Sequence, residues 1–226
     1  LQHAVFDMLL PGGDAAVKHP SRTALAHLWA AGVEWDPALP PVAVTTETTR
    51  RIFQRQFATG FNTVPTSSMG RLFDAVAALA GVRQTATYEA QAAIEFEALA
   101  SDRAGTPYRF ALAPEGECFD AAPVIQAIAQ DVRQGVPVAQ IGANFHQAVV
   151  DLIVELSVRV RQEEKLNTVA LSGGVFQNVL LLRLAVTRLR DAGFQVLTHR
   201  LTPPNDGGLA LGQVMVAHTQ RSGGPP

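Results

Sequence analysis

The chain has 226 residues, of which 47% are apolar, and its mean hydropathy is +0.12. A chain of this length and composition can bury a sizeable core, which is typical of a globular domain. Its 18 basic and 20 acidic residues give a net charge of −2, which argues against nucleic acid as a partner. No apolar run is long enough to cross a bilayer, so we expect no membrane association. The single cysteine, Cys118, excludes a disulfide framework and favours a cytoplasmic protein.

Hydrophobic periodicity and turn residues predict a mainly helical first half. We expect a strand at 3–9, helices at 21–31, 47–58, 70–80, 88–101 and 121–134, a short strand at 108–113, and loops at 35–41 and 62–68. Ser67 or Ser68 can cap the helix at 70–80, because serine oxygens accept hydrogen bonds from the first amides of a helix. The first strand has no start signal before it and Leu1 is not methionine, so we expect the chain to be part of a longer protein.

Helices and strands alternate in the second half. We expect a long amphipathic helix at 143–165, a strand at 168–171, a helix at 178–192, a strand at 194–200 and a helix at 208–219, followed by a disordered tail at 221–226. This order requires a sheet with helices packed against it, and it therefore predicts an α/β fold.

A glycine-containing loop, Ser172–Asn178, joins the strand at 168–171 to the following helix. Gly173 and Gly174 let the backbone turn sharply and approach a ligand without a Cβ in the way. Amides at the start of a helix favour an anion such as phosphate. The alternative is a tight turn followed by a helix cap.

A second loop, Thr202–Gly208, follows the strand at 194–200. Its carboxylate, Asp206, can bind a divalent metal ion, or it can simply cap the final helix. Ligands of open α/β sheets bind outside the carboxyl ends of the strands, where both loops lie. We therefore expect the two loops to be neighbours in one site.

Five segments together resemble the C-terminal domain of the HypF carbamoyltransferases, which supply the cyanide ligands of hydrogenases. They are LPGGDAAV at 10–17, SSMGRLFDA at 67–75, TYEAQAAIE at 87–95, SGGVFQN at 172–178 and PPNDGGLALGQ at 203–213. The resemblance runs nearly end to end and keeps the family's order. It implies an α/β fold, a ribonuclease-H-like lobe of the actin-like ATPase superfamily with an added helical insertion. The insertion would occupy 14–140, and 141–220 would be the sheet-and-helix part that binds nucleotide.

The resemblance also implies a chemistry. ATP and carbamoyl phosphate would give carbamoyl-adenylate, and the carbamoyl group would pass to the C-terminal cysteine of the partner HypE. The residues that the family motifs assign to the nucleotide are Ser67, Gly70, Glu95, Gly173, Gly174 and Asn178. Asp206 would be a ligand of a divalent metal, which could be iron, zinc or magnesium. No catalytic residue is assigned.

Alternatives remain for some of these residues. Glu95 could be one exposed acid among several on its helix, next to Glu89 and Glu97. Arg71 and Asp74 are expected to serve helix packing and surface pairing rather than chemistry.

One part of the family pattern is missing. The family's metal site also uses two histidines one helical turn apart, and this sequence contains no such pair. We therefore expect the chain to begin after that helix, to lack the first lobe and to be inactive alone. Alternative functions are an antibiotic O-carbamoyltransferase, a tRNA threonylcarbamoyl-type transferase and a non-catalytic actin-like module. The tRNA enzymes usually have Gly-Gly-Pro where this chain has Ala90-Gln91-Ala92, which argues against them.

Overall fold

The structure, a computed structural model, describes residues 8–13, 15–100, 104–113 and 118–221. The chain forms two compact units, Leu1–Arg159 (unit 1) and Val160–Pro226 (unit 2). The division falls inside the long helix α8 (Val138–Glu164). In the part of the chain that is described, no helix is both long and apolar enough to span a membrane.

Unit 1 contains a small antiparallel sheet that the sequence did not predict. Strand β1 (Met8–Pro11) pairs with β2 (Thr63–Thr66), and Leu10 lies opposite Val64. The prediction of a loop at 62–68 is therefore wrong, because pairing with a strand far away in the sequence fixes these residues as extended backbone. Residues 3–7 of the strand expected at 3–9 lie outside the described residues, and its remaining two residues belong to β1.

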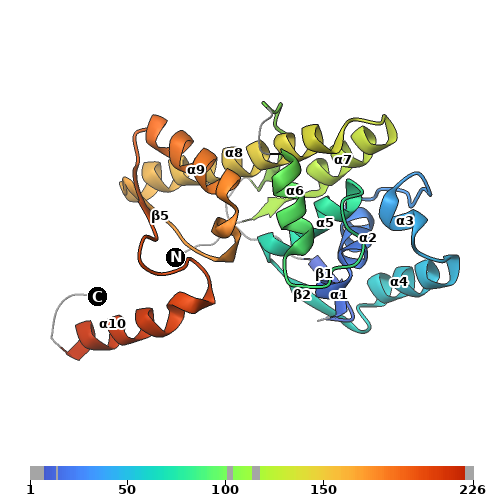
Figure 1. Cartoon of the computed structure of the whole chain (residues 1–226), viewed down its shortest axis with the longest axis horizontal. Helices are drawn as coiled ribbons and strands as arrows, with labels where there is room; N and C mark the ends of the chain where they lie inside the picture. The colour runs from blue at the N-terminus through green and yellow to red at the C-terminus, as the bar shows by residue number, and fades with distance from the viewer. Residues whose placement is uncertain (1–7, 14, 101–103, 114–117, 222–226) are drawn as a thin grey trace. The chain divides into compact units, whose positions relative to one another are not determined.

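Helices make up most of unit 1 (Figure 1). They are α1 (Ala15–Lys18), α2 (Pro20–Ala30), α3 (Pro40–Ala43), α4 (Glu47–Thr59), α5 (Met69–Leu79), α6 (Gln91–Ala100), α7 (Ala122–Arg133) and most of α8, with a short hairpin of β3 (Ala111–Leu112) and β4 (Phe119–Asp120) before α7. The predictions for α2, α4, α5 and α7 are confirmed to within a residue or two. The long helix starts at Val138 rather than 143, because the Pro137 carbonyl already accepts from the amides of Gln140 and Ile141.

The core of unit 1 is centred on α5. This helix lies alongside α2 (Figure 1), and Leu72, Phe73, Val76 and Leu79 are all buried. Small alanines fill much of the rest of α5, which lets neighbouring helices approach on several sides. Phe73 meets Phe145 of α8 edge to face, with ring centroids 4.9 Å apart. Such aromatic pairs stabilise a core beyond the area that they bury.

Unit 2 has the alternating order that the sequence predicts. Its strands β5 (Thr168–Leu171) and β6 (Gln195–Thr198) are parallel, and α9 (Val179–Asp191) connects them. Leu171, Leu181 and Leu189 are buried between these elements. The crossover is closed by Arg161, whose guanidinium lies 4.1 Å from the centroid of the Phe194 ring and donates to the carbonyl of Ala192 at 2.8 Å.

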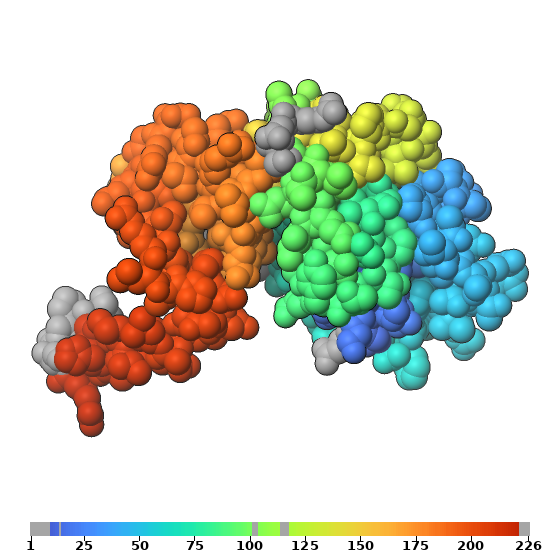
Figure 2. Space-filling model, in the orientation of Figure 1, coloured from blue at the N-terminus to red at the C-terminus, as the bar shows by residue number. Residues whose placement is uncertain are grey.

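The last helix, α10 (Leu209–Arg221), has no buried residue. Figure 2 shows it, in red, with its surface open along its length on the face in view. Its exposed apolar side chains include Leu209, Leu211, Val214, Met215 and Val216. Of the tail expected at 221–226, Arg221 is the final residue of α10 and the others lie outside the described residues.

Candidate functional site

The two loops expected to bind ligand begin at the same end of the sheet of unit 2. Leu171 of β5 pairs in register with Thr198 of β6, so Ser172 and His199 are the first residues beyond two neighbouring strands. Parallel strands present their carboxyl ends at one edge of a sheet. The fold of unit 2 therefore brings the start of both loops together.

Direct contacts join the two loops. The amide of Gly173 donates to the carbonyl of Pro204 at 2.7 Å. Nε2 of His199 lies 2.8 Å from the hydroxyl of Ser172. A Cβ placed on Gly174 would be 3.9 Å from the Cβ of Asn205, which is ordinary contact. The expectation that the loops are neighbours at one end of the sheet is confirmed.

The two glycines of the first loop have different backbone requirements. Gly173 has φ 107° and ψ 155°, a conformation that is essentially restricted to glycine. The next residue, Gly174, opens the short 3₁₀ helix η1 (Gly174–Gln177), and its φ is not positive. Gly173 is therefore required by the backbone of the turn, whereas the conformation of Gly174 is open to any residue.

The side chain of Asn178 caps α9. Its Oδ1 accepts a hydrogen bond from the Leu181 amide at 2.7 Å, which satisfies one of the first free amides of that helix. The helix-cap alternative for this end of the loop is thus confirmed for Asn178. A contact with nucleotide through the same side chain stays a prediction.

Asn205, not Asp206, provides the cap in the second loop. The Asn205 side chain accepts from the Gly207 amide at 3.1 Å and precedes the 3₁₀ helix η2 (Asp206–Gly208), which leads into α10. The interpretation of Asp206 as a helix cap is therefore wrong, because its neighbour already fills that position. The Asp206 carboxylate is exposed and has no hydrogen bond or ion pair within the described residues.

The glycines after Asp206 are needed by the loop itself. A Cβ on Gly207 would lie 3.0 Å from Cγ of Pro203, and one on Gly208 would lie 3.0 Å from the Pro203 carbonyl oxygen. Both distances are tighter than ordinary contact. Pro203 thus folds back over the backbone that follows Asp206 and holds this carboxylate on a stiff turn.

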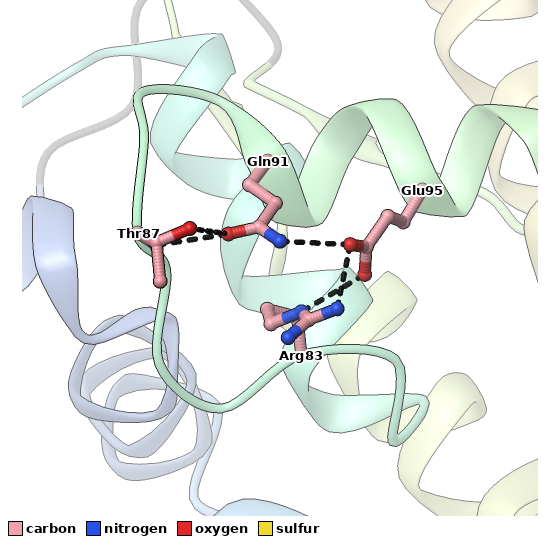
Figure 3. Close-up of polar contacts among 4 residues, drawn as sticks. All are labelled: Arg83, Thr87, Gln91 and Glu95. Carbon is pink, nitrogen blue, oxygen red and sulfur yellow. Dashed lines mark hydrogen bonds and ion pairs between the residues drawn. The ribbon is translucent and has the colours of Figure 1, made fainter.

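A carboxylate and an arginine form an ordered pair in unit 1. Arg83 binds Glu95 of α6 through two hydrogen bonds, Nε to Oε2 at 2.9 Å and Nη2 to Oε1 at 2.6 Å (Figure 3). Gln91 donates to the same carboxylate at 2.9 Å and accepts from the Thr87 amide at 2.8 Å. Hydrogen bonding from Arg83 is the main cause that holds the pKa of Glu95 below its usual value. Glu95 is therefore a fixed anion, unlike a freely solvated acid on a helix surface.

The serines before α5 divide their roles. Ser68 caps this helix, since its hydroxyl accepts from the Arg71 amide, whereas Ser67 is exposed and Gly70 lies in the first turn. Ser67, Gly70 and Glu95 belong to unit 1, and Gly173, Gly174, Asn178 and Asp206 belong to unit 2.

Arg71 and Asp74 form a buried ion pair rather than a surface one. Nη1 of Arg71 lies 3.0 Å from Oδ2 of Asp74, and the two side chains are 14% and 5% exposed. Burial raises the pKa of Asp74 to about 6, although the positive charge of Arg71 opposes this shift. The expectation of helix packing is met, but the pairing is internal.

The residues that the structure describes do not include a complete set of metal ligands. Among the described residues, no cluster of three or more His, Cys, Asp or Glu side chains could hold a metal ion. Asp206 alone offers one carboxylate, so the described residues do not by themselves make a metal site.

The sequence did not single out His199 or Arg83. His199 could have been found by its position, because it is the first residue after a strand whose partner strand ends just before Ser172. Arg83 gave no such signal, since it meets Glu95 only through the fold of the segment between α5 and α6.

A family model described as "Carbamoyltransferase, Kae1-like Domain, second subdomain" matches residues 3–213. The chain belongs to this family. Carbamoyltransferase HypF2 of Cupriavidus necator is 34% identical, over 93% of this chain and 29% of that protein. Carbamoyltransferase HypF of Rhizobium leguminosarum is 38% identical, over 90% of this chain and 26% of that protein.

The fold agrees with the same family. A crystal structure of full-length HypF in a phosphate- and nucleotide-bound form matches with a TM-score of 0.88 and 34% identity, over 96% of this chain and 34% of that one. The predicted α/β lobe of the actin-like superfamily is thereby confirmed. The chain spans roughly a quarter to a third of the length of these HypF relatives.

Proposed function

We propose that this chain is the nucleotide-binding part of a carbamoyltransferase that acts in hydrogenase maturation. The observation that carries the proposal is the family match over residues 3–213. In addition, the two loops expected to bind ligand, Ser172–Asn178 and Thr202–Gly208, are joined by a hydrogen bond. The HypF structure that it resembles is described as phosphate- and nucleotide-bound. The reaction would take place in the cytoplasm, which suits a chain with a single cysteine.

The reaction that we propose uses carbamoyl phosphate and ATP and passes through carbamoyl-adenylate. In its last step, the thiolate of the C-terminal cysteine of HypE attacks the carbamoyl carbon. A carbon–sulfur bond forms, the bond from that carbon to the AMP phosphate oxygen breaks, and AMP leaves. Thiolate rather than thiol is the reacting form, so the cysteine proton must leave before or during attack.

The phosphate of the adenylate would lie against the Ser172–Asn178 loop. Because the Gly173 amide already donates to Pro204, we assign the close approach of the ligand to Gly174. Gly174 is exposed and carries no side chain to block it. Asn178, at the end of this loop, would contact the nucleotide.

Ser67, Gly70 and Glu95 would contact the nucleotide, as the family motifs assign them. Ser67 is exposed, and its hydroxyl has no hydrogen-bond partner among the residues described. Oε1 of Glu95 already accepts from both Arg83 and Gln91, whereas Oε2 accepts only from Arg83. Oε2 can therefore also accept from a ribose hydroxyl.

Asp206 would be one ligand of a divalent metal ion, which could be iron, zinc or magnesium. Its further ligands would come from residues outside those described, in keeping with the histidine pair that the family uses. A bound cation would supply positive charge next to the phosphate.

The direct test is carbamoyl transfer by the full-length protein. Purified HypE is incubated with ATP and radiolabelled carbamoyl phosphate, and the label is located by peptide mapping. We expect label on the C-terminal cysteine that requires ATP, and none on HypE with this cysteine replaced by alanine. Transfer to an aminoglycoside-type hydroxyl, or threonylcarbamoylation of tRNA, would overturn the HypE assignment. Active HypE and folded enzyme without any transfer would favour a non-catalytic module.

A further inference from the structure

His199 contacts both loops of unit 2. Its Nε2 lies 2.8 Å from the Ser172 hydroxyl, and its Nδ1 lies 3.2 Å from the Thr202 hydroxyl. Ser172 opens the glycine-containing loop, and Thr202 opens the loop that carries Asp206. One imidazole thus joins the two segments beside the hydrogen bond from the Gly173 amide to Pro204.

The sheet places the histidine where a bridge is geometrically easy. Leu171 and Thr198 are the last paired residues of two parallel strands, so the chains that leave them start side by side. Imidazole has two polar atoms on opposite sides of a rigid ring, and it can therefore reach both partners at once. Each hydroxyl can donate or accept, so the bridge can form whichever nitrogen carries the proton.

Burial does not explain this bridge. His199, Ser172 and Thr202 lie at the surface of unit 2, where a hydrogen bond adds little to folding because water competes for the same groups. What the bridge does restrict is the relative position of the two loops. Restricting a loop before a ligand arrives removes part of the entropic cost of binding.

We propose that His199 is a positioning residue that holds the Ser172–Gly174 turn against the Thr202–Pro204 segment for the nucleotide phosphate. The proposal rests on the proposed function, because it takes the phosphate to bind at this turn. His199 is not assigned a contact with the reacting atoms.

Three substitutions of His199 distinguish its contact with Ser172 from its contact with Thr202. Glutamine places its amide about as far along the side chain as Nε2, so His199→Gln keeps a partner for Ser172. Asparagine places its amide near the position of Nδ1, so His199→Asn keeps only a partner for Thr202. His199→Phe keeps a ring and removes both polar atoms.

The first measurement needs no nucleotide. Hydrogen exchange of the Gly173 amide, which donates to Pro204, reports how firmly the two loops are held together. In the full-length protein we expect about tenfold faster exchange in the Phe and Asn variants and near wild-type exchange in the Gln variant. Equal exchange in all four proteins would overturn the positioning role.

The second measurement is calorimetric titration of the same proteins with a non-hydrolysable ATP analogue. We expect about tenfold weaker binding by the Phe and Asn variants, recovery in the Gln variant, and melting temperatures within a few degrees of one another.

Ser172→Ala should weaken binding as His199→Phe does, and the double variant should bind no worse than either. Additive losses would show that His199 does not act through Ser172. If hydrogen exchange changes as expected but the wild-type protein binds no nucleotide, the role of His199 in holding the two loops is supported and the proposed function is contradicted.

Discussion

At the scale of single residues, Gly173 and Gly174 are adjacent but serve different purposes. The first has φ 107°, which a residue with a Cβ rarely adopts, whereas the second does not have a positive φ. A Cβ on Gly174 would have only the Cβ of Asn205, at 3.9 Å, nearby. The described residues therefore give no internal reason for glycine at 174, whereas the proposed approach of a ligand would give one.

This difference predicts opposite outcomes for two matched substitutions. Gly174→Ala should leave thermal stability nearly unchanged but weaken nucleotide binding by the full-length protein. Gly173→Ala should lower the free energy of unfolding by about 1–3 kcal/mol, because it forces alanine into a glycine-only conformation. Thermal melting and titration with an ATP analogue test both variants. Unchanged affinity in a folded Gly174→Ala protein would reduce the loop to a tight turn.

Asp74 should make stability depend on pH. Its pKa is raised by burial from 3.8 to about 6, so the folded state holds its proton more tightly than the unfolded state does. This contribution is fully present below pH 3.8 and is lost as pH rises through 6. When the pH rises from 5 to 7.5, the free energy of unfolding of wild type should fall by about 1 kcal/mol relative to that of Asp74→Asn, which cannot ionise.

The comparison of wild type with Asp74→Asn isolates this effect. His27 and His146 are buried, and burial lowers their pKa values to about 3 and about 4. They destabilise the fold as pH falls below their unfolded value of 6.5, which is the opposite direction, but both proteins contain them. Chemical denaturation at the two pH values gives the difference. A difference that does not change with pH would mean that Asp74 ionises normally.

The sequence indicates the two loops but not the role of every residue within them. Neighbouring residues of similar chemistry cannot be separated by pattern alone, and Asn205 rather than Asp206 provides the cap. His199 and Arg83 were missed for another reason. Their partners lie far away along the chain, at separations of 27 and 12 residues, and only the fold brings them together.

At the scale of elements, local patterns predicted long helices and the α/β alternation of unit 2. Amphipathic periodicity and glycine stops depend on near neighbours, which explains why α4 and α7 were predicted to within a residue. Strand β2 was not predicted, because it is defined by pairing with β1 about fifty residues earlier.

The contact between α6 and α8 provides a test at this scale. A Cβ on Gly142 of α8 would lie 2.8 Å from Cβ of Ala100 and 3.2 Å from Cε2 of Phe96, and both neighbours are buried in α6. Helix propensity favours alanine over glycine, but an extra methyl group in this packed contact lowers the free energy of unfolding by about 1–3 kcal/mol. Gly142→Ala should therefore destabilise the protein.

A matched glycine in α10 provides the control. A Cβ on Gly212 would have no atom within 4 Å, so Gly212→Ala should not destabilise the chain and should gain helix propensity. Denaturant unfolding of both variants tests the pair. Equal stability changes would mean that α6 and α8 do not approach each other closely at Gly142.

At the scale of the whole molecule, the chain is one part of a carbamoyltransferase architecture. It matches the second subdomain of the family, and it spans 34% of the full-length HypF structure that it resembles. Under the proposed function, Asp206 would supply one ligand of a metal site whose other ligands come from residues outside those described. Periodicity alone predicted the α/β class, and the family motifs predicted the actin-like lobe, which the match to HypF confirms.

The most direct test of this account is Asp206→Asn in the full-length protein. Asn205 already provides the cap, so the substitution should shift the melting temperature by no more than a few degrees. The matched control, Asn205→Ala, should cost about 1 kcal/mol of stability but keep the carboxylate.

The measurement is bound metal, together with carbamoyl transfer to HypE, in wild type and both variants. A neutral amide is a much poorer ligand than a carboxylate for a divalent cation, so Asp206→Asn should lose both the bound metal and the transfer activity. Asn205→Ala should retain both. Wild-type metal content and full transfer in the folded Asp206→Asn protein would contradict the account.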